Sequence, residues 1–308
     1  MCIRDRDGSN PIQVNVYTPD MTPPQLSSFT QLDMNSENIR LMFNEPMNET
    51  RIDFSGITIC SDPTCMDNYA LNGGENVRFI DNFRQVIHID LIPEDIRGIK
   101  LLFPMLATSP TNSFVRVTDG TFFDTTGNPN VATATAQPVD PNNYRADTTS
   151  PSLLSFQLDV NSGILNLTFN DVIDVRSVQY MFITLQNEQE RVSTTEFVTL
   201  TNAVPVSDND YSIQIRIING DLNNLKAVPS LATNENDTYI VLGSNAFADV
   251  AGSFLLPVTE SNALQASFVG PDTQRPELMA FTFNASTGVL TLMFNEVVNV
   301  SGIVPSGL

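Results

Sequence analysis

The chain of 308 residues has no tryptophan, one histidine, three cysteines and only 15 basic residues against 35 acidic ones. Without tryptophan, and with only six tyrosines, it has little from which to build a sugar-stacking surface. The formal charge of -20 argues against nucleic acid or an anionic membrane surface as partner, because both require a basic footprint. No apolar run approaches the roughly 20 residues of a membrane span. Cations are the expected counterparts of such a chain.

The sequence also lacks the residue patterns of a catalytic site. His88, the only histidine, alternates with Ile87 and Ile89, and we predict that it faces solvent in a strand rather than acting as a base. No Gly-rich loop follows a strand, and no Ser-His-Asp or Cys-His signature is present. We therefore expect no enzymatic activity.

Two of the three cysteines lie close together. Cys60 and Cys65 enclose Ser-Asp-Pro-Thr, a turn-forming loop, and a disulfide across it would suit an oxidising compartment. Free thiols are the alternative, whereas a metal or redox pair lacks further Cys or His ligands nearby. Cys2 belongs to the first six residues, which match nothing in the rest of the chain. The sequence therefore predicts a Cys60–Cys65 disulfide as a local staple.

One strand pattern occurs three times in the chain. It covers Ile39 to Glu45, Leu165 to Asp171 and Leu290 to Glu296. In the middle copy Leu165, Leu167 and Phe169 alternate with polar residues, as in a strand with one buried face. The same three apolar positions recur in the other two copies, and in every copy the phenylalanine is followed by Asn and an acid. The phenylalanines of successive copies are 126 and 125 residues apart. The chain is therefore a tandem array of one module.

The rest of the module is repeated as well. A linker of the form Asp-x-x-x-Pro precedes each copy, at Asp20 to Pro24, Asp147 to Pro151 and Asp272 to Pro276, and its proline suits the entrance to an edge strand. Asp95 to Lys100 and Asp221 to Lys226 predict short helices that begin at a capping aspartate. Many short strands without a βαβ rhythm predict an all-β fold of antiparallel sandwich modules, each with a short helical insertion.

These repeats predict the domain boundaries. Residues 7–22 are expected to form the C-terminal strand of a preceding module, 24–147 and 151–272 two complete modules, and 276–308 the N-terminal part of a further one. Because the pattern starts and stops within a module, we expect the printed chain to be a fragment of a longer protein.

The proline-led strand, the Leu-Thr-Phe-Asn-acid strand and the late Asp-x-x-Gly-Asn turn resemble the tandem bacterial Ig-like domains of S-layer and large adhesin-type surface proteins. The modules depart from that family because they exceed the roughly 100 residues of a simple Ig domain and carry the helical insertion. The resemblance implies a non-catalytic extracellular or cell-surface segment that serves as a stalk, spacer or adhesive rod.

The same resemblance implies the partners. They would be neighbouring modules of the same chain and a glycan or protein at the cell surface. The alternative function is a carbohydrate- or protein-binding module appended to an enzyme or receptor outside this chain.

Sandwich geometry predicts where the recurring acids meet. The second strand runs back toward its own linker, and the loop before the last strand lies at the same end. Three acids should therefore converge in each module: Asp20, Glu45 and Asp124 in the first, and Asp147, Asp171 and Asp249 in the second. Ca²⁺ takes six to eight oxygen ligands of this kind, which gives the hypothesis that calcium binds here and stiffens the linker. The alternative is that these are ordinary turn residues bonded to their own backbone.

Overall fold

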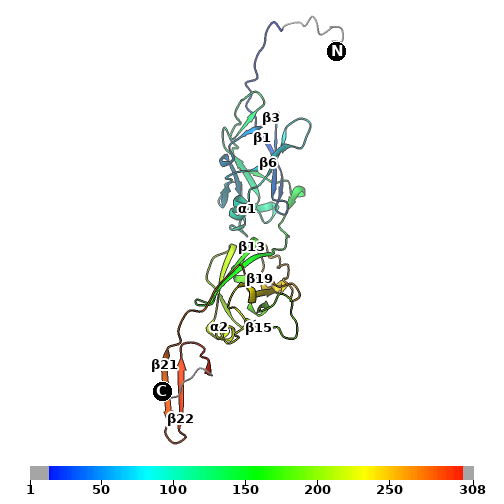
Figure 1. Cartoon of the computed structure of the whole chain (residues 1–308). Helices are drawn as coiled ribbons and strands as arrows, with labels where there is room; N and C mark the ends of the chain where they lie inside the picture. Colours follow the sequence, from blue (N-terminus) through cyan, green and yellow to red (C-terminus); the bar gives the residue numbers. More distant parts are fainter. Residues whose placement is uncertain (1–13, 301–308) are drawn as a thin grey trace. The chain divides into compact units, whose positions relative to one another are not determined.

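The computed structural model describes residues 14–300 (Figure 1). Strands dominate, and the described α-helices are α1 (Pro93–Lys100) and α2 (Asn219–Lys226). The chain divides into two compact units, one made of residues up to 92 with 113–144 and the other of 93–112 with residues from 145 onward. Helix α1 and the loop after it therefore belong to the second unit, although the repeat had placed them in the module at 24–147.

Both ends of the predicted array extend past the described residues. Of the strand predicted at 7–22, residues 7–13 lie outside the described residues, and 14–22 form no strand. Residues 301–308 of the module predicted at 276–308 also lie outside them. What the structure does describe of that module is a hairpin.

The first unit is a sandwich of a five-stranded and a four-stranded sheet. The larger sheet has the order β11 (Tyr144–Arg145), β1 (Leu26–Asp33), β2 (Asn38–Phe43), β7 (Val86–Asp90) and β6 (Glu75–Phe79). The smaller one has the order β10 (Gln137–Pro138), β8 (Phe114–Val117), β4 (Ile57–Cys60) and β5 (Asn68–Ala70). A separate antiparallel pair joins β3 (Met47–Ile52) to β9 (Phe122–Asp124).

The second unit repeats this architecture. Its five-stranded sheet has the order β16 (Ala203–Pro205), β17 (Asp210–Ile217), β13 (Ile164–Ile173), β12 (Leu153–Asp159) and β20 (Phe268–Gly270). Its four-stranded sheet has the order β15 (Phe197–Thr199), β14 (Ile183–Gln186), β18 (Tyr239–Leu242) and β19 (Leu264–Gln265). The terminal hairpin is formed by β21 (Leu278–Asn284) and β22 (Val289–Phe294). The predicted all-β sandwich class is confirmed.

Short 3-10 helices connect these strands. They are η1 (Phe54–Gly56), η2 (Pro110–Asn112), η3 (Pro141–Asn143), η4 (Val175–Ser177), η5 (Tyr180–Phe182), η6 (Glu235–Asp237) and η7 (Ser244–Ala246). Several begin at an Asp or Asn whose side chain accepts a backbone N–H two residues on, as at Asp53, Asp140 and Asp174. This bond satisfies a donor that the short helix leaves open.

The repeated strand forms the second half of a hairpin in every copy. Antiparallel pairing joins β1 to β2, β12 to β13 and β21 to β22. The alternating side chains face the cores of the two units, where Ile39, Leu41 and Phe43 are fully buried and Leu165 and Leu167 are as well. Each such side chain contributes about 1.5 to 3 kcal/mol when buried. Burial of one face is thus what fixes the register of the hairpin.

The prediction that His88 faces solvent is wrong, since the side chain is only 2% exposed. The residue lies in β7 between β2 and β6, directly opposite Arg40 on one side and Arg78 on the other. Arg40 Nε donates to His88 Nδ1 at 3.2 Å, and His88 Nε2 lies 2.6 Å from Asp90 Oδ1. Long arginine side chains on neighbouring strands can enclose a residue that alternation places on the outer face.

Candidate functional site: acids and lysines at the linkers

Paired phenylalanines fix the position of four recurring acids. Phe43 in β2 packs on Phe122 in β9 with ring centroids 4.8 Å apart, and Phe169 in β13 packs on Phe247 at 5.5 Å. All four rings are almost completely buried. An acid follows each ring by two residues, namely Glu45, Asp124, Asp171 and Asp249. Each aromatic pair therefore holds two acids at the same end of its sandwich.

The asparagine that precedes the strand-end acid holds the linker in place. Its side-chain Oδ1 accepts the N–H of the residue that follows the linker proline. These bonds are Gln25 to Asn44 at 2.8 Å, Ser152 to Asn170 at 2.6 Å and Glu277 to Asn295 at 2.7 Å. The asparagine N–H donates back to the same residue's carbonyl at 3.1 Å in all three copies. The acid after the asparagine is thereby brought next to the linker.

The linker aspartates also share one geometry. One oxygen of each accepts the N–H two residues on, from Thr22 at 2.9 Å for Asp20, Thr149 at 3.1 Å for Asp147 and Gln274 at 3.1 Å for Asp272. This is the self-bonded turn that Asp commonly forms. It occupies only one of the two carboxylate oxygens, so the second oxygen is left for another partner.

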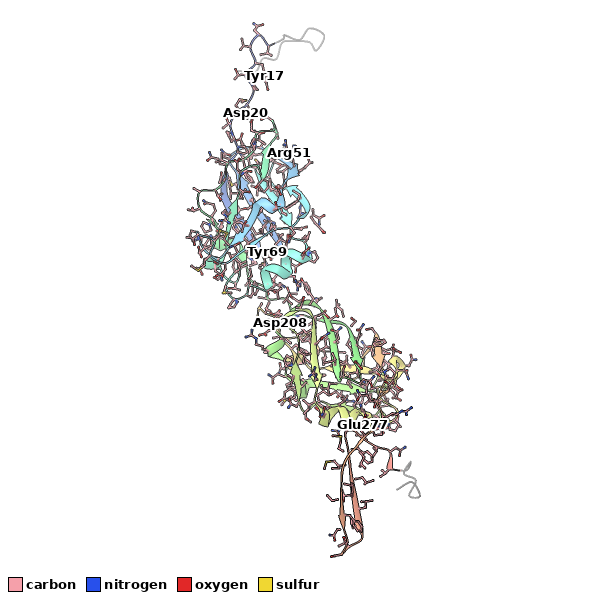
Figure 2. All side chains as sticks on the ribbon, turned by 90° about the vertical axis from the view of Figure 1, so that its left-hand side faces the viewer. Tyr17, Asp20, Arg51, Tyr69, Asp208 and Glu277 are labelled. Atoms are coloured by element: carbon pink, nitrogen blue, oxygen red, sulfur yellow. A yellow bond between two sulfur atoms is a disulfide. The ribbon has the colours of Figure 1, made fainter. Side chains whose placement is uncertain are left out.

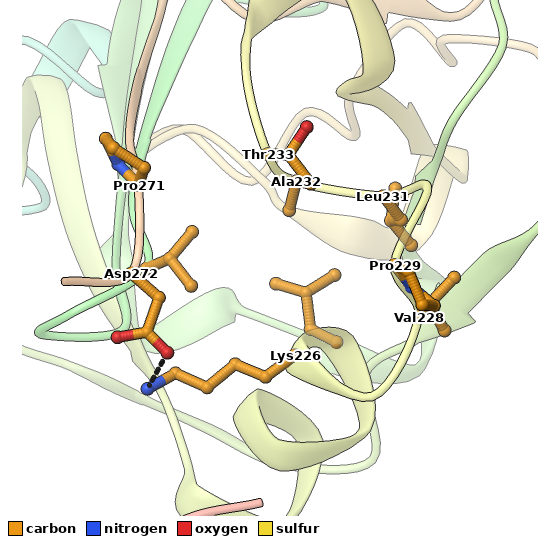
Figure 3. A pocket seen from close by; sticks show the side chains of 10 residues that line it. Lys226, Val228, Pro229, Leu231, Ala232, Thr233, Pro271 and Asp272 are labelled. Atoms are coloured by element: carbon orange, nitrogen blue, oxygen red, sulfur yellow. Dashed lines mark ion pairs between the residues drawn. The ribbon is translucent and has the colours of Figure 1, made fainter. Parts of the chain in front are cut away.

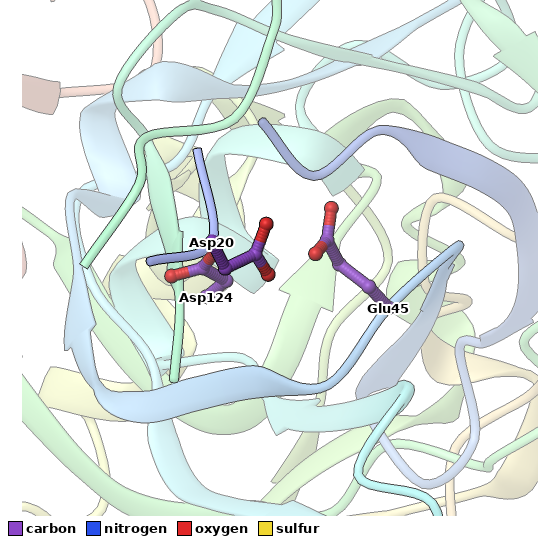
Figure 4. A group of neighbouring side chains, drawn as sticks. All are labelled: Asp20, Glu45 and Asp124. Carbon is purple, nitrogen blue, oxygen red and sulfur yellow. The ribbon is translucent and has the colours of Figure 1, made fainter. Parts of the chain in front are cut away.

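The six predicted acids meet in the two predicted groups. We call Asp20, Glu45 and Asp124 the first acid set, and Asp147, Asp171 and Asp249 the second acid set. Within each set, one carboxylate oxygen from every residue lies within 4.8 Å of the other two. Figure 4 shows the side chains of the first set turned toward one another. Asp20 lies near one end of its unit, with Arg51 close to that end and Tyr69 nearer the other (Figure 2). Asp272 and Glu296 form the third acid set, which has two acids among the described residues.

A lysine ammonium lies inside the second acid set. Lys100, the last residue of α1, places Nζ 2.7 Å and 2.9 Å from the two oxygens of Asp171. Nζ is also 2.8 Å from Asp147 Oδ2, as an ion pair without hydrogen-bond alignment. All three residues are at least nine-tenths buried. Burial lowers the pKa of Lys100, but the close contacts of its ammonium with Asp147 and Asp171 outweigh burial, so the pKa is raised and the ammonium form is favoured.

The third acid of this set has no such partner. Asp249 is 2% exposed, and its Oδ2 makes no hydrogen bond, while Oδ1 accepts the N–H of Ser253 at 2.8 Å. Burial, reinforced by the charges of Asp147 and Asp171, raises the pKa of Asp249 to about 6. One ammonium thus faces three carboxyl groups, and Asp249 is the one that most readily carries a proton.

The first acid set differs because Asp124, the acid in its turn, accepts hydrogen bonds from its own loop through both carboxylate oxygens. Asp124 accepts the N–H groups of Thr126 and Asn128 at 2.8 Å, and its Oδ2 accepts the Asn128 amide at 2.8 Å. These bonds outweigh burial and lower the pKa of Asp124. Burial, then the charges of Asp20 and Asp124, raise the pKa of Glu45, whose Oε1 is buried without a hydrogen bond. Between residues 14 and 300, no lysine or arginine pairs with these acids.

The third acid set again contains a lysine. Lys226, the last residue of α2, places Nζ 3.0 Å from Asp272 Oδ2 and 3.0 Å from Glu296 Oε2. Hydrogen bonds to Glu296 and Asp272 outweigh burial and raise the pKa of Lys226. The pair lies beside a pocket of about 200 Å³ between the loop after α2 and the linker (Figure 3). Its other walls are mainly apolar, from Val160, Leu225, Val228, Pro229, Leu231 and Pro271.

The lysines were not among the predicted site residues, although the sequence carries a signal for them. Lys100 and Lys226 are the only lysines of the 308 residues. They precede Asp147 and Asp272 by 47 and 46 residues, and each ends a helix. An amino acid that occurs twice in the whole chain, at equivalent positions of two repeats, is a strong indication of a shared role.

The helix start was also misassigned. Asp221 was predicted to cap α2, but the cap position is Ile218, which makes no side-chain cap hydrogen bond. Asp221 instead accepts the N–H groups of Thr201 and Asn202 at 2.7 Å and 2.9 Å. The carboxylate therefore anchors a neighbouring loop rather than the first turn of its own helix, an alternative that short-range sequence rules do not consider.

Cys60 and Cys65 are joined by a disulfide at the end of β4. In the second unit the corresponding residue of β14 is Gln186, which is fully buried. Its amide donates to the carbonyl of Glu188 at 2.8 Å, and it accepts from Arg191 Nε at 3.2 Å. A covalent staple in one repeat is thus replaced by a hydrogen-bond network in the other.

Comparison with known proteins gives similarities at the level of structure. No family model and no curated protein matches the chain. The N-terminal part of the bacterial S-layer protein SbsC has 11% identity and a TM-score of 0.26, over 64% of this chain and 44% of that one. Native α2-macroglobulin from Escherichia coli, domains MG0-NIE-MG1, has 8% identity and a TM-score of 0.28, over 86% and 79%. The FN1-FN3 domains of chicken CNTN1 have 10% identity and a TM-score of 0.18, over 79% and 68%.

At these TM-scores the likeness carries no argument about function. The chain spans less than half the length of the SbsC segment it matches. Among the described residues, neither helix has the length and apolar character needed to cross a bilayer.

Proposed function

We propose that this chain is a non-catalytic segment of an extracellular or cell-surface protein, in which repeated sandwich modules serve as a stalk, spacer or adhesive rod. The observation that carries the proposal is one linker arrangement used repeatedly. The same contacts recur around Lys100 and Lys226. In both places the lysine ends a helix and pairs with the linker aspartate and with the acid at the end of the strand. The linker aspartate accepts a hydrogen bond from its own turn, and an asparagine holds the strand end against the linker. A repeating mechanical element needs the same connection at each step, because its properties are set by nearest neighbours.

Composition and covalent structure support the extracellular part of the proposal. The Cys60–Cys65 disulfide is of the kind that persists in oxidising compartments. The excess of acidic residues gives a formal charge of -20, which keeps a long repetitive chain soluble. The same charge concentrates repulsion wherever acids cluster, so the linkers require a cation.

Calcium stays a prediction for both acid sets, and in the first set it is the alternative to a lysine ammonium. Three carboxylates lie together there, and the described residues supply no ammonium or guanidinium to them. In the second acid set, Nζ of Lys100 already lies between two of the acids and supplies a counter-charge without a metal. The lysine is therefore our proposed stiffening cation for that linker.

Small-angle scattering of the full chain tests the rod. We expect an extended particle whose maximum dimension is the same in calcium chloride and in EGTA, with Lys100→Met as the variant that weakens the linker. A compact or fully flexible particle in both buffers would contradict the rod. An extended particle in calcium alone would transfer the stiffening role from the lysine to the metal.

A further inference from the structure

The first acid set has the same construction as the two sets that hold a lysine. Asp20 matches Asp147 and Asp272 in its self-bonded turn, and Asn44 holds Gln25 as its counterparts hold theirs. Its strand-end acid, Glu45, corresponds to Glu296, which binds Lys226 at 3.0 Å. The two sets that contain a lysine show what this arrangement binds.

We propose that Asp20 and Glu45 form a socket for a lysine ammonium at the end of a helix, supplied by a repeat of the same kind joined ahead of Asp20. The proposal deepens the proposed function, since it names the partner that a linker of this type requires. By the spacing of the other two copies, that lysine would precede Asp20 by 46 or 47 residues.

The distribution of hydrogen bonds favours an ammonium over calcium. Both oxygens of Asp124 are engaged by Thr126 and Asn128, so the first acid set offers two free acids rather than three. Lys100 and Lys226 each bind two acids as well, one from the linker and one from the strand end. Ca²⁺ takes six to eight oxygens, so a metal here would need several ligands besides these two carboxylates.

Glu45 presents a carboxylate oxygen to which an ammonium could donate. Its Oε1 is buried and makes no hydrogen bond. Removal of a carboxylate oxygen from water is unfavourable unless a donor replaces the water. An ammonium at this point would form ion pairs with Glu45 and Asp20 together, as Nζ of Lys226 does with Glu296 and Asp272 in the third acid set.

The test adds a repeat with a helix-end lysine to the chain. A copy of residues 24–146 is joined directly ahead of Asp20 in a chain that continues to residue 308, which places the added helix-end lysine 47 residues before Asp20. Residue 101 of the added copy is changed, Leu101→Val, so that its lysine peptide has its own mass. Native-state acetylation, followed by mass spectrometry, then reports each lysine separately, because only the neutral amine reacts.

Occupation of the socket predicts slow acetylation of the added lysine. A raised pKa lowers the fraction of neutral amine, so we expect the added lysine to react as slowly as Lys226 and to lose this protection in the Asp20→Asn/Glu45→Gln double variant. Asp119→Asn, an exposed acid of the same unit, is the matched control and should leave the protection intact. The acetylation rate of Lys226 in the same molecule is the reference for a lysine that is bound by two acids in the folded chain.

Two results would overturn the assignment. One is an added lysine that reacts as fast as an exposed amine while Lys100 and Lys226 stay protected. The other is calorimetric binding of calcium to the 308-residue chain that Glu45→Gln abolishes and the added repeat leaves unchanged. Neither result depends on the shape of the particle, so failure of the socket is distinguishable from failure of the rod in scattering.

Discussion

The first and second acid sets begin from the same repeat and differ in how their charge is neutralised. In the second set, Lys100 lies between Asp147 and Asp171, and Asp249 has an oxygen without a donor. In the first set, the turn acid Asp124 is fully bonded and the described residues contribute no lysine. Both repeats therefore keep the three acids, but they differ in the group that compensates the negative charge.

Two substitutions account for the contrast between the turn acids. Gly127 and Gly252 adopt the same left-handed conformation, with φ of 98° and 91°, so the turns themselves match. The donors Thr126 and Asn128 of the first turn are replaced by Ala251 and Ser253 in the second. Loss of a hydroxyl and an amide leaves Asp249 with the Ser253 N–H as its hydrogen-bond donor, which explains the opposite pKa shifts of Asp124 and Asp249.

The largest effect is expected from removal of the buried ammonium. Lys100→Met leaves Asp147 and Asp171 buried without a counter-charge and should destabilise the second unit by about 3 to 5 kcal/mol. Lys226→Met is the matched variant, and it should cost only about 1 kcal/mol because Asp272 is partly exposed. Urea unfolding followed by hydrogen exchange of peptides from β13 measures both. An equal loss of stability in the two variants would show that the deeper burial of Lys100 does not strengthen its ion pairs relative to those of Lys226.

Asp249 should make the second unit less stable as pH rises. Its pKa is about 6 in the folded chain against an ordinary value of 3.8, so the folded state holds the proton more tightly. The resulting stabilisation is present below pH 3.8 and is lost as pH rises through about 6. This stabilisation amounts to about 3 kcal/mol at low pH, and roughly 1.5 kcal/mol of it is lost between pH 5 and pH 8.

The measurement is the unfolding free energy of wild type relative to Asp249→Asn at several pH values. Relative to Asp124→Asn, the unfolding free energy of the wild type should change with pH in the opposite direction. The pKa of Asp124 is lowered, so its stabilisation is present above its ordinary pKa and is lost as pH falls through the folded value. The same pH dependence in both variants would contradict the contrast between the two turns. The double change Ala251→Thr/Ser253→Asn should lower the pKa of Asp249 toward that of Asp124.

The covalent staple gives the next largest effect. Removal of the disulfide with Cys60→Ala/Cys65→Ala should destabilise the first unit by about 2 kcal/mol, the loop-closure entropy of so short a loop. The second unit, where Gln186 occupies this place, should be unchanged. Thermal unfolding with and without a reducing agent checks the result, and a shift of both units would show that the staple is not local.

The smallest effect is expected at the asparagine that holds the linker. Asn170→Ala removes the acceptor for the N–H of Ser152 and should cost about 1 kcal/mol. Asn44→Ala should have the same effect in the first unit, since the bond from Gln25 is equivalent. Faster hydrogen exchange confined to Ser152 or Gln25 is the expected observation. Exchange unchanged at these amides would show that the side chain contributes nothing to the linker.

Much of this fold could be predicted from period-2 alternation. The strands around Phe43, Phe169 and Phe294, their hairpins and the convergence of three acids all follow from which face of a strand is buried and which way the chain returns. These features are local or depend on topology alone. The sequence signal is strong because one face of each hairpin must be apolar.

What could not be predicted depends on contacts distant in sequence. Nothing near Asp171 indicates that Lys100, 71 residues earlier, supplies its counter-ion. The burial of His88 depends on arginines from two other strands, and the role of Asp221 depends on a loop 20 residues away. Calcium was expected because the acids alone suggest a divalent ion, whereas a lysine can serve when a helix end reaches the same place.

The most direct test of a lysine as the linker cation uses the chain's only two lysines. Native-state acetylation of the 308-residue chain in EGTA should modify Lys100 at least about tenfold more slowly than after urea unfolding, with Lys226 intermediate because it is less buried. Protection of Lys100 without metal is the expected result. Acetylation of Lys100 at the unfolded rate, or protection that requires calcium, would contradict it.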